Sequence, residues 1–130
     1  MKREFIPYAQ AVALQELGFN EPCFGSWFNY EDKNIVVLLS ENIDGWYDHY
    51  ADNLQVASPL YRQAFRWFRD KHQLEGEVRC ITFNSKRLKG YQYAITSKNY
   101  QSFEQLGDYY SYEYAEFECL KKLIELAKNQ

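Results

Sequence analysis

The chain has 130 residues, 46% of them hydrophobic and 25% charged, and its formal net charge is −3. This length predicts one globular domain, 1–130, that buries a core without help from disulfides or a structural metal. The three cysteines have no paired spacing, which favours reduced, buried thiols and a cytoplasmic location. The chain has no apolar run of signal-peptide or membrane-spanning length, so we expect no membrane association.

Charge is segregated along the chain. Residues 1–58 carry a net charge of −6, residues 59–98 carry +6, and residues 99–130 carry −3. One interpretation is that surface ion pairs between these segments help to hold the fold together, each contributing little. The other is that the central segment forms a positive patch that attracts an acidic partner.

The first part of the chain predicts a helix followed by a hairpin. The helix begins at Pro7 and ends in a Schellman-like turn at Gly18. Residues 23–30 are aromatic and residues 35–39 are continuously apolar, so both are expected to be strands, joined by a polar turn. Residues 41–57 predict an irregular segment with at most one helical turn.

The most sharply marked element is a helix over residues 58–74. Ser58 is expected to be its N-cap and Pro59 its first helical residue. One face is apolar and aromatic, and another carries three arginines at helical spacing: Arg62, Arg66 and Arg69. This arginine face is either a solvated surface that keeps the helix soluble or a docking surface for phosphate or carboxylate groups.

A second hairpin and a last helix complete the chain. Residues 77–83 and 91–96 alternate as strands do, with a basic turn between them that contains Lys86, Arg87 and Lys89. Residues 98–110 predict a polar, tyrosine-bearing loop. Ser111 is placed to cap a final helix with a buried stripe made of Phe117, Leu120, Leu123, Ile124 and Ala127.

The element order is therefore helix, hairpin, helix, hairpin, helix. Two hairpins with apolar faces need to be covered, and the three helices carry matching apolar stripes. This pattern predicts an α+β fold in which a four-stranded antiparallel sheet has the helices packed on one face.

Three segments also resemble a known group of proteins. They are FIPYAQAVALQELGFNEPCFG, PLYRQAFRWFRDKHQL and YEYAEFECLKKLIELAK. Together they resemble a widespread set of small uncharacterised proteins from phages, prophages and other mobile elements of Bacteroidota-like bacteria. The resemblance covers about half of the chain. It implies an accessory protein that acts inside a bacterial host cell, and it implies no catalytic residues.

The sequence contains no recognisable catalytic, cofactor-binding or metal-binding motif. Asp44, Asp48 and Asp52 with His49 are an acidic cluster, but their spacing does not match a calcium loop, and a solvated segment is the simpler interpretation. No phosphate-binding glycine loop or nucleophile elbow is present. We therefore expect a protein that is not an enzyme.

Two functions fit these features. The first is a protein-binding factor that acts on a host or phage protein, because the chain has twelve tyrosines and exposed tyrosine is common at interfaces. Its expected surface contains Tyr109, Tyr110 and Tyr112, and the protein is expected to be a monomer or a homodimer. The alternative is a nucleic-acid-binding module that uses the arginine face and the basic turn, although an acidic pI near 5.4 disfavours it.

Overall fold

The computed structural model describes residues 4–30, 33–37, 55–83, 88–99, 102–109 and 111–130. The chain divides into two compact units, Met1–Ala64 and Phe65–Gln130, and each is described by itself. That the two units behave as one domain stays a prediction. The described residues are α+β, with three helices and two antiparallel sheets.

The first unit contains helix α1 (Tyr8–Glu16) and a three-stranded sheet. The predicted end of α1 is confirmed: Gly18 adopts a φ of 99°, and the Phe19 amide donates to the Leu14 carbonyl at 2.9 Å. This is the Schellman arrangement, in which glycine tolerates the left-handed backbone. Leu14 and Phe19 are both buried, so the turn also anchors α1 to the core of this unit.

The sheet of the first unit has the strand order β2-β1-β3. Its strands are β1 (Gly25–Tyr30), β2 (Lys33–Val37) and β3 (Gln55–Ser58). The predicted hairpin of β1 and β2 is confirmed by their antiparallel pairing. Strand β3 lies in what was expected to be an irregular segment, and it pairs with the other edge of β1.

The N-cap predicted at Ser58 is wrong. Ser58 is the last residue of β3, and its buried hydroxyl donates to the Ile6 carbonyl at 2.9 Å. Helix α2 (Tyr61–His72) starts later, and the first amide bonded inside it is that of Ala64, which donates to the Leu60 carbonyl at 3.0 Å. A Ser-Pro pair matches a helix start in sequence, but here the serine hydroxyl satisfies a carbonyl far away in the chain.

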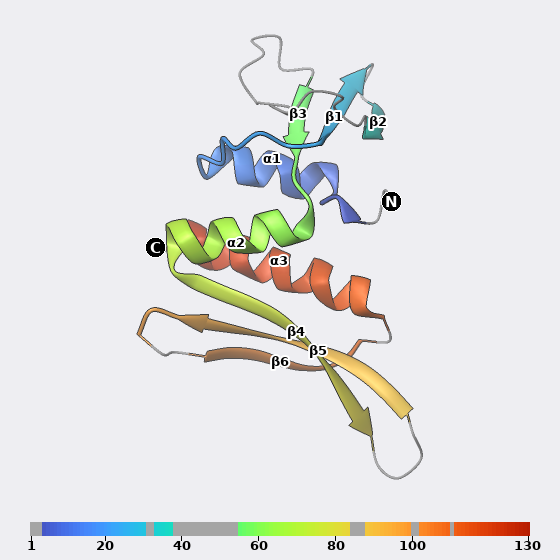
Figure 1. Ribbon diagram of the computed structural model, residues 1–130, viewed down its shortest axis with the longest axis vertical. Coiled ribbons are helices and arrows are strands. Elements are labelled where there is room, and N and C mark those ends of the chain that lie inside the picture. The colour runs from blue at the N-terminus through green and yellow to red at the C-terminus, as the bar shows by residue number, and fades with distance from the viewer. Residues whose placement is uncertain (1–3, 31–32, 38–54, 84–87, 100–101, 110) are drawn as a thin grey trace. The chain divides into compact units, whose positions relative to one another are not determined.

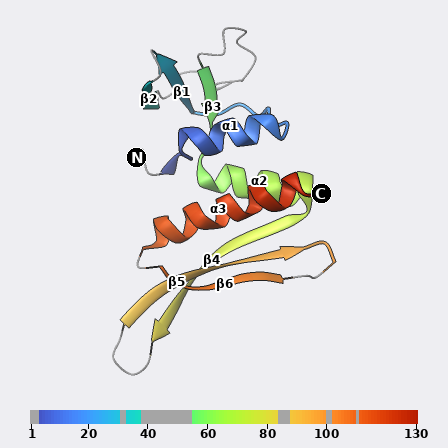
Figure 2. The same ribbon diagram turned by 180° about the vertical axis from the view of Figure 1, so that it is seen from behind.

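The second unit contains three strands and the last helix. They are β4 (Leu74–Phe83), β5 (Leu88–Ser97), β6 (Ser102–Tyr109) and α3 (Tyr112–Lys128). The three strands form an antiparallel sheet in the order β4-β5-β6, and α3 packs on it. Figure 1 and the reverse view in Figure 2 show α3 lying along one face of this sheet.

Register and burial agree on which face of this sheet carries the core. Gly76 of β4 lies opposite Ile95 of β5, and Val78 lies opposite Tyr93. Ile95 and Tyr93 are buried, as are the residues of the stripe that α3 presents: Ala115, Cys119, Leu120, Leu123, Ile124 and Ala127. The predicted hairpin and the predicted stripe are thus largely confirmed, although Phe117 is only half-buried.

The single four-stranded sheet is not what the described residues form. Two strands were not expected: β3, and β6 in the segment 98–110 that was expected to be a loop. Each adds to its own hairpin, so the two hairpins belong to two three-stranded sheets. The prediction that helices cover one face of a single shared sheet is therefore wrong for the described residues, because their strands pair in two separate sheets.

Among the described residues, no helix is both long and apolar enough to cross a membrane.

Candidate functional site

Among the described side chains of the second unit, the most exposed aromatic ones lie on the first turn of α3. Tyr112 is 45% exposed and Tyr114 is 53% exposed. Both follow Ser111, whose hydroxyl accepts a hydrogen bond from the Tyr114 amide at 3.1 Å. The predicted cap at Ser111 is therefore confirmed, and it fixes the backbone from which the two rings project.

Neighbouring rings hold each of these tyrosines. Tyr112 meets Tyr91 of β5 edge to face, with centroids 5.9 Å apart and an interplanar angle of 89°. Tyr114 stacks on Phe117, one turn later, at 6.4 Å and 24°. Tyr112 and Tyr114 are two positions apart on the helix and project in different directions, so they form two separate ring pairs. We call these two ring pairs at the start of α3 the aromatic patch. Because rings that contact one another lose few further rotamers on binding, such a patch is suited to a protein interface.

The surroundings of the aromatic patch are acidic. The pKa of the Tyr112 hydroxyl is raised above its ordinary value of 10.0, mainly by partial burial and then by the charges of Glu116, Cys119 and Glu113. The hydroxyl therefore stays protonated and remains a hydrogen-bond donor at neutral pH. A patch with exposed rings, the protonated hydroxyl of Tyr112 and acidic neighbours favours an apolar or basic protein surface over a phosphate backbone.

The arginine face of α2 is also present. Arg62, Arg66 and Arg69 are all exposed, as the sequence predicts for either interpretation of this face. Arg69 is not a free cation, because its guanidinium lies 3.8 Å from Asp70 and 4.0 Å from Glu75. The positive charge at this end of α2 is therefore partly offset by neighbouring carboxylates.

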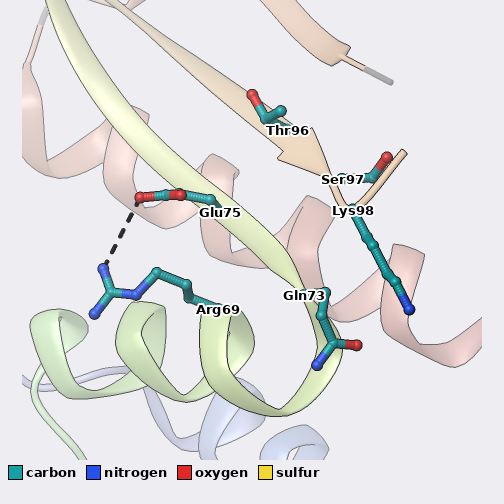
Figure 3. A pocket seen from close by; sticks show the side chains of 6 residues that line it. All are labelled: Arg69, Gln73, Glu75, Thr96, Ser97 and Lys98. Atoms are coloured by element: carbon teal, nitrogen blue, oxygen red, sulfur yellow. Dashed lines mark ion pairs between the residues drawn. The ribbon is translucent and has the colours of Figure 1, made fainter. Parts of the chain in front are cut away.

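A polar depression of about 320 Å³ lies where α2 joins β4 and β5 ends. Six residues line it: Arg69, Gln73, Glu75, Thr96, Ser97 and Lys98. Figure 3 shows the side chains of Arg69 and Glu75 turned toward one another, whereas Lys98 extends away from the pair. The two cations do not converge on one point, so the depression lacks the geometry of an organised anion site.

Of the basic residues predicted to act together, Arg69 and the backbone of Lys89 can be compared within the second unit. Lys89 of β5 pairs in register with Thr82, whereas Arg69 contacts Glu75 near the start of β4. The seven residue-to-residue steps from Glu75 to Thr82 span roughly 24 Å of extended strand. The backbone of Lys89 thus lies near the opposite end of β4 from Arg69.

Several predicted site residues cannot be placed. Lys86, Arg87 and Tyr110 lie outside the described residues, as does the acidic cluster of Asp44, Asp48, His49 and Asp52. Lys89 and Tyr109 lie in strands, but their side chains are outside what the structure describes. Of the three tyrosines expected at the surface, Tyr112 is confirmed as exposed. Tyr114 was missed, although its place in the first turn of the predicted helix, beside the cap, was a usable signal.

The cysteines form no reactive pair within the part of the chain that the structure describes. Cys23 and Cys119 are buried, as predicted, but Cys80 is exposed on β4, where the prediction of a buried thiol is wrong. Burial raises the pKa of Cys119 to about 12, with a smaller contribution from Glu116. No group of three or more His, Cys, Asp or Glu side chains among these residues is arranged to hold a metal ion.

Comparison with known proteins does not assign the chain to a family: no family model, curated protein or solved structure matches it. The resemblance to phage and mobile-element proteins therefore remains a prediction, and the function has to be inferred from the surfaces themselves.

Proposed function

We propose that this protein is a protein-binding factor and that the aromatic patch at the start of α3 is its binding surface. The observation that carries the proposal is the exposure of Tyr112 and Tyr114 on a capped helix turn. Large aromatic side chains fixed on regular structure are the residues that most often dominate the affinity of a protein interface. Here they project from a turn whose backbone is held by Ser111.

Charge supports a protein partner in preference to a nucleic acid. The formal net charge is −3, and Arg69 already contacts two carboxylates. Nucleic-acid-binding domains usually gather basic residues on one face, whereas Arg69 and Lys89 lie at opposite ends of β4. That the partner is a host or phage protein rests on the resemblance of the three helical segments alone.

Affinity capture from a lysate of the organism that encodes the protein tests this proposal. The tagged chain and the variants Tyr112→Ala and Tyr114→Ala are compared with and without nuclease. We expect a protein to be retained after nuclease treatment, and its affinity to fall about 30-fold in each variant, as for interface residues that contribute about 2 kcal/mol.

The matched control is Phe24→Ala. Phe24 is 56% exposed and lies in the first unit, outside the aromatic patch. This variant should retain the partner with unchanged affinity. If the tyrosine variants capture the partner as well as the parent chain does, the aromatic patch is not the binding surface.

The alternative, a nucleic-acid-binding module, is favoured by one observation: three arginines are exposed along α2. A nucleic-acid-binding module predicts a different result of the affinity capture, because captured partners would be lost after nuclease treatment. Binding would also weaken steeply with added salt, and each phosphate contact removed by Arg62→Ala or Arg66→Ala would lower the salt slope by about one.

A further inference from the structure

Strand β4 is an outer strand of the second unit. Within the described part of the chain it pairs with β5 alone, in ten consecutive register pairs from Leu74↔Ser97 to Phe83↔Leu88. In Figure 1 its C-terminal half runs away from α3. Every second residue of an outer strand directs its N–H and C=O groups away from the sheet, and this row is a template for another strand.

The two faces of β4 differ in character. Leu74, Gly76 and Val78 face α3: Leu74 is buried, Val78 is half-buried, and a Cβ at Gly76 would contact Cys119. The alternate residues Glu75, Glu77 and Arg79 are exposed on the opposite face. Glu77 and Arg79 form an ion pair two residues apart on this face.

This charge pattern selects one register if β4 pairs antiparallel with β4 of a second copy. A register that slips by one residue places α3-facing side chains opposite solvent-facing ones and is excluded. In each remaining register the two-fold axis passes beside one residue of β4. That residue then lies opposite the same residue of the second copy. With Glu77 on the axis two glutamates are opposed, although Glu75 of each copy then lies opposite Arg79 of the other and only residues 74–80 overlap. With Arg79 on the axis two arginines are opposed. Like charges directly opposite destabilise a sheet.

With Val78 on the axis, every opposed charge on this face is complementary. Glu77 of each copy then lies opposite Arg79 of the other, so that two ion pairs form across the axis. Residues 74–82 of the two strands overlap, which is nearly the full length of β4. Moving the axis to Cys80 removes both ion pairs and shortens the overlap.

We propose that the protein forms a homodimer through antiparallel pairing of β4 strands, with Val78 on the two-fold axis. The two sheets become one six-stranded sheet, and the symmetry places both copies of α3 on the same face. Main-chain hydrogen bonds supply affinity, as in other cases of strand addition, while the charged residues set the register. The intrachain pair of Glu77 and Arg79 exchanges partners across the axis.

Charge reversal tests this register directly. In Glu77→Arg the two central pairs oppose arginine with arginine, and in Arg79→Glu they oppose glutamate with glutamate. Each variant should dimerise about ten- to thirty-fold more weakly than the parent chain. Mixing the two variants restores opposite charges at both pairs, so a one-to-one heterodimer should form with near-parental affinity. The double variant Glu77→Arg/Arg79→Glu should likewise form a homodimer.

Sedimentation equilibrium from about 1 µM to about 1 mM measures these constants, and native mass spectrometry identifies the heterodimer. The matched control is Glu16→Arg, the same charge change at an exposed residue of α1, which should leave dimerisation unchanged. Circular dichroism checks that every variant is folded. A parent chain that stays monomeric throughout, or a mixture that does not recover dimerisation, overturns the proposal.

This homodimer is independent of the proposed protein-binding function. The aromatic patch lies on α3 and β5, outside β4, so Tyr112→Ala and Tyr114→Ala should still dimerise. Loss of partner capture with the dimer intact, or loss of the dimer with capture intact, separates the two proposals.

Discussion

Gly76 of β4 packs closely against α3, and replacing it with alanine tests how tightly the two elements pack. A Cβ at this position would lie 3.0 Å from the Cys119 sulfur and 3.0 Å from Cδ1 of Leu123. Both side chains are fully buried and belong to α3, so neither can rotate into solvent. The added methyl group therefore requires α3 or β4 to shift.

Two effects of Gly76→Ala have opposite signs. Glycine to alanine in a compatible backbone stabilises a protein by about 0.4–1 kcal/mol, because the unfolded chain loses conformational freedom. Adding a methyl group to a well-packed core typically costs about 1–3 kcal/mol. With two contacts at 3.0 Å the packing cost is larger, and we expect a net loss of about 1–2 kcal/mol in the free energy of unfolding.

Urea unfolding followed by circular dichroism measures this loss, and a double-mutant cycle assigns its cause. Cys119→Ala removes the sulfur atom that the new methyl group would meet. If the clash is real, Gly76→Ala should cost less in the Cys119→Ala background, with a coupling energy of about 0.5–1 kcal/mol. A Gly76→Ala variant as stable as the parent chain, or additive effects in the cycle, would refute this account of the packing.

Two further predictions concern α3. Ser111→Ala should lower the free energy of unfolding by about 1 kcal/mol, because the Tyr114 amide loses its acceptor. Ser111→Asp should retain most of the stability, because aspartate can also accept this hydrogen bond. Urea unfolding measures both effects. The pKa of Cys119 is about 12 in the folded protein and 9.0 ordinarily, so the free energy of unfolding should fall by about 1.4 kcal/mol for each pH unit above 9. Unfolding measured at pH 8–11 should show a smaller decrease in this free energy for Cys119→Ala than for the parent chain. A decline that is identical in this variant would show that other groups cause it.

Local signals in the sequence predicted the elements that local interactions determine. Gly18 and Ser111 mark helix ends because their backbone and hydroxyl act within a few residues, and both assignments are confirmed. The alternation over residues 91–96 placed Tyr93 and Ile95 on one face, and both are buried. Such features can be predicted from nearby residues, because no distant segment is needed to produce them.

The elements that were missed depend on distant partners. Strand β6, SFEQLGDY, contains no β-branched residue and one glycine, so its composition favours a loop. It becomes a strand because β5 offers an edge with which it pairs. Strand β3 has four residues and ends in a Ser-Pro sequence typical of a helix start, yet the Ser58 hydroxyl bonds to Ile6. In both cases tertiary pairing overrides local preference.

The same distinction explains which parts of the candidate surfaces were predictable. Periodicity identified the arginine face, because exposure follows from helix geometry once the opposite face is buried. It could not show that Arg69 meets Glu75, because that contact depends on where β4 begins after α2. Nor could it separate Tyr93, which is buried, from Tyr112, which is exposed, since the same side chain serves both environments.

Strand β4 shows how one short sequence can meet two requirements at once. Its α3-facing residues include a glycine that packs closely against the helix, whereas the intervening positions carry two glutamates and an arginine. Charged residues on an outer strand usually oppose pairing with another chain. Here each neighbouring register opposes one like-charged pair, whereas the register with Val78 on the axis opposes none, so the pattern that limits aggregation also favours the proposed dimer. Reversing Glu77 or Arg79 alone should abolish that selectivity, whereas reversing both should restore it.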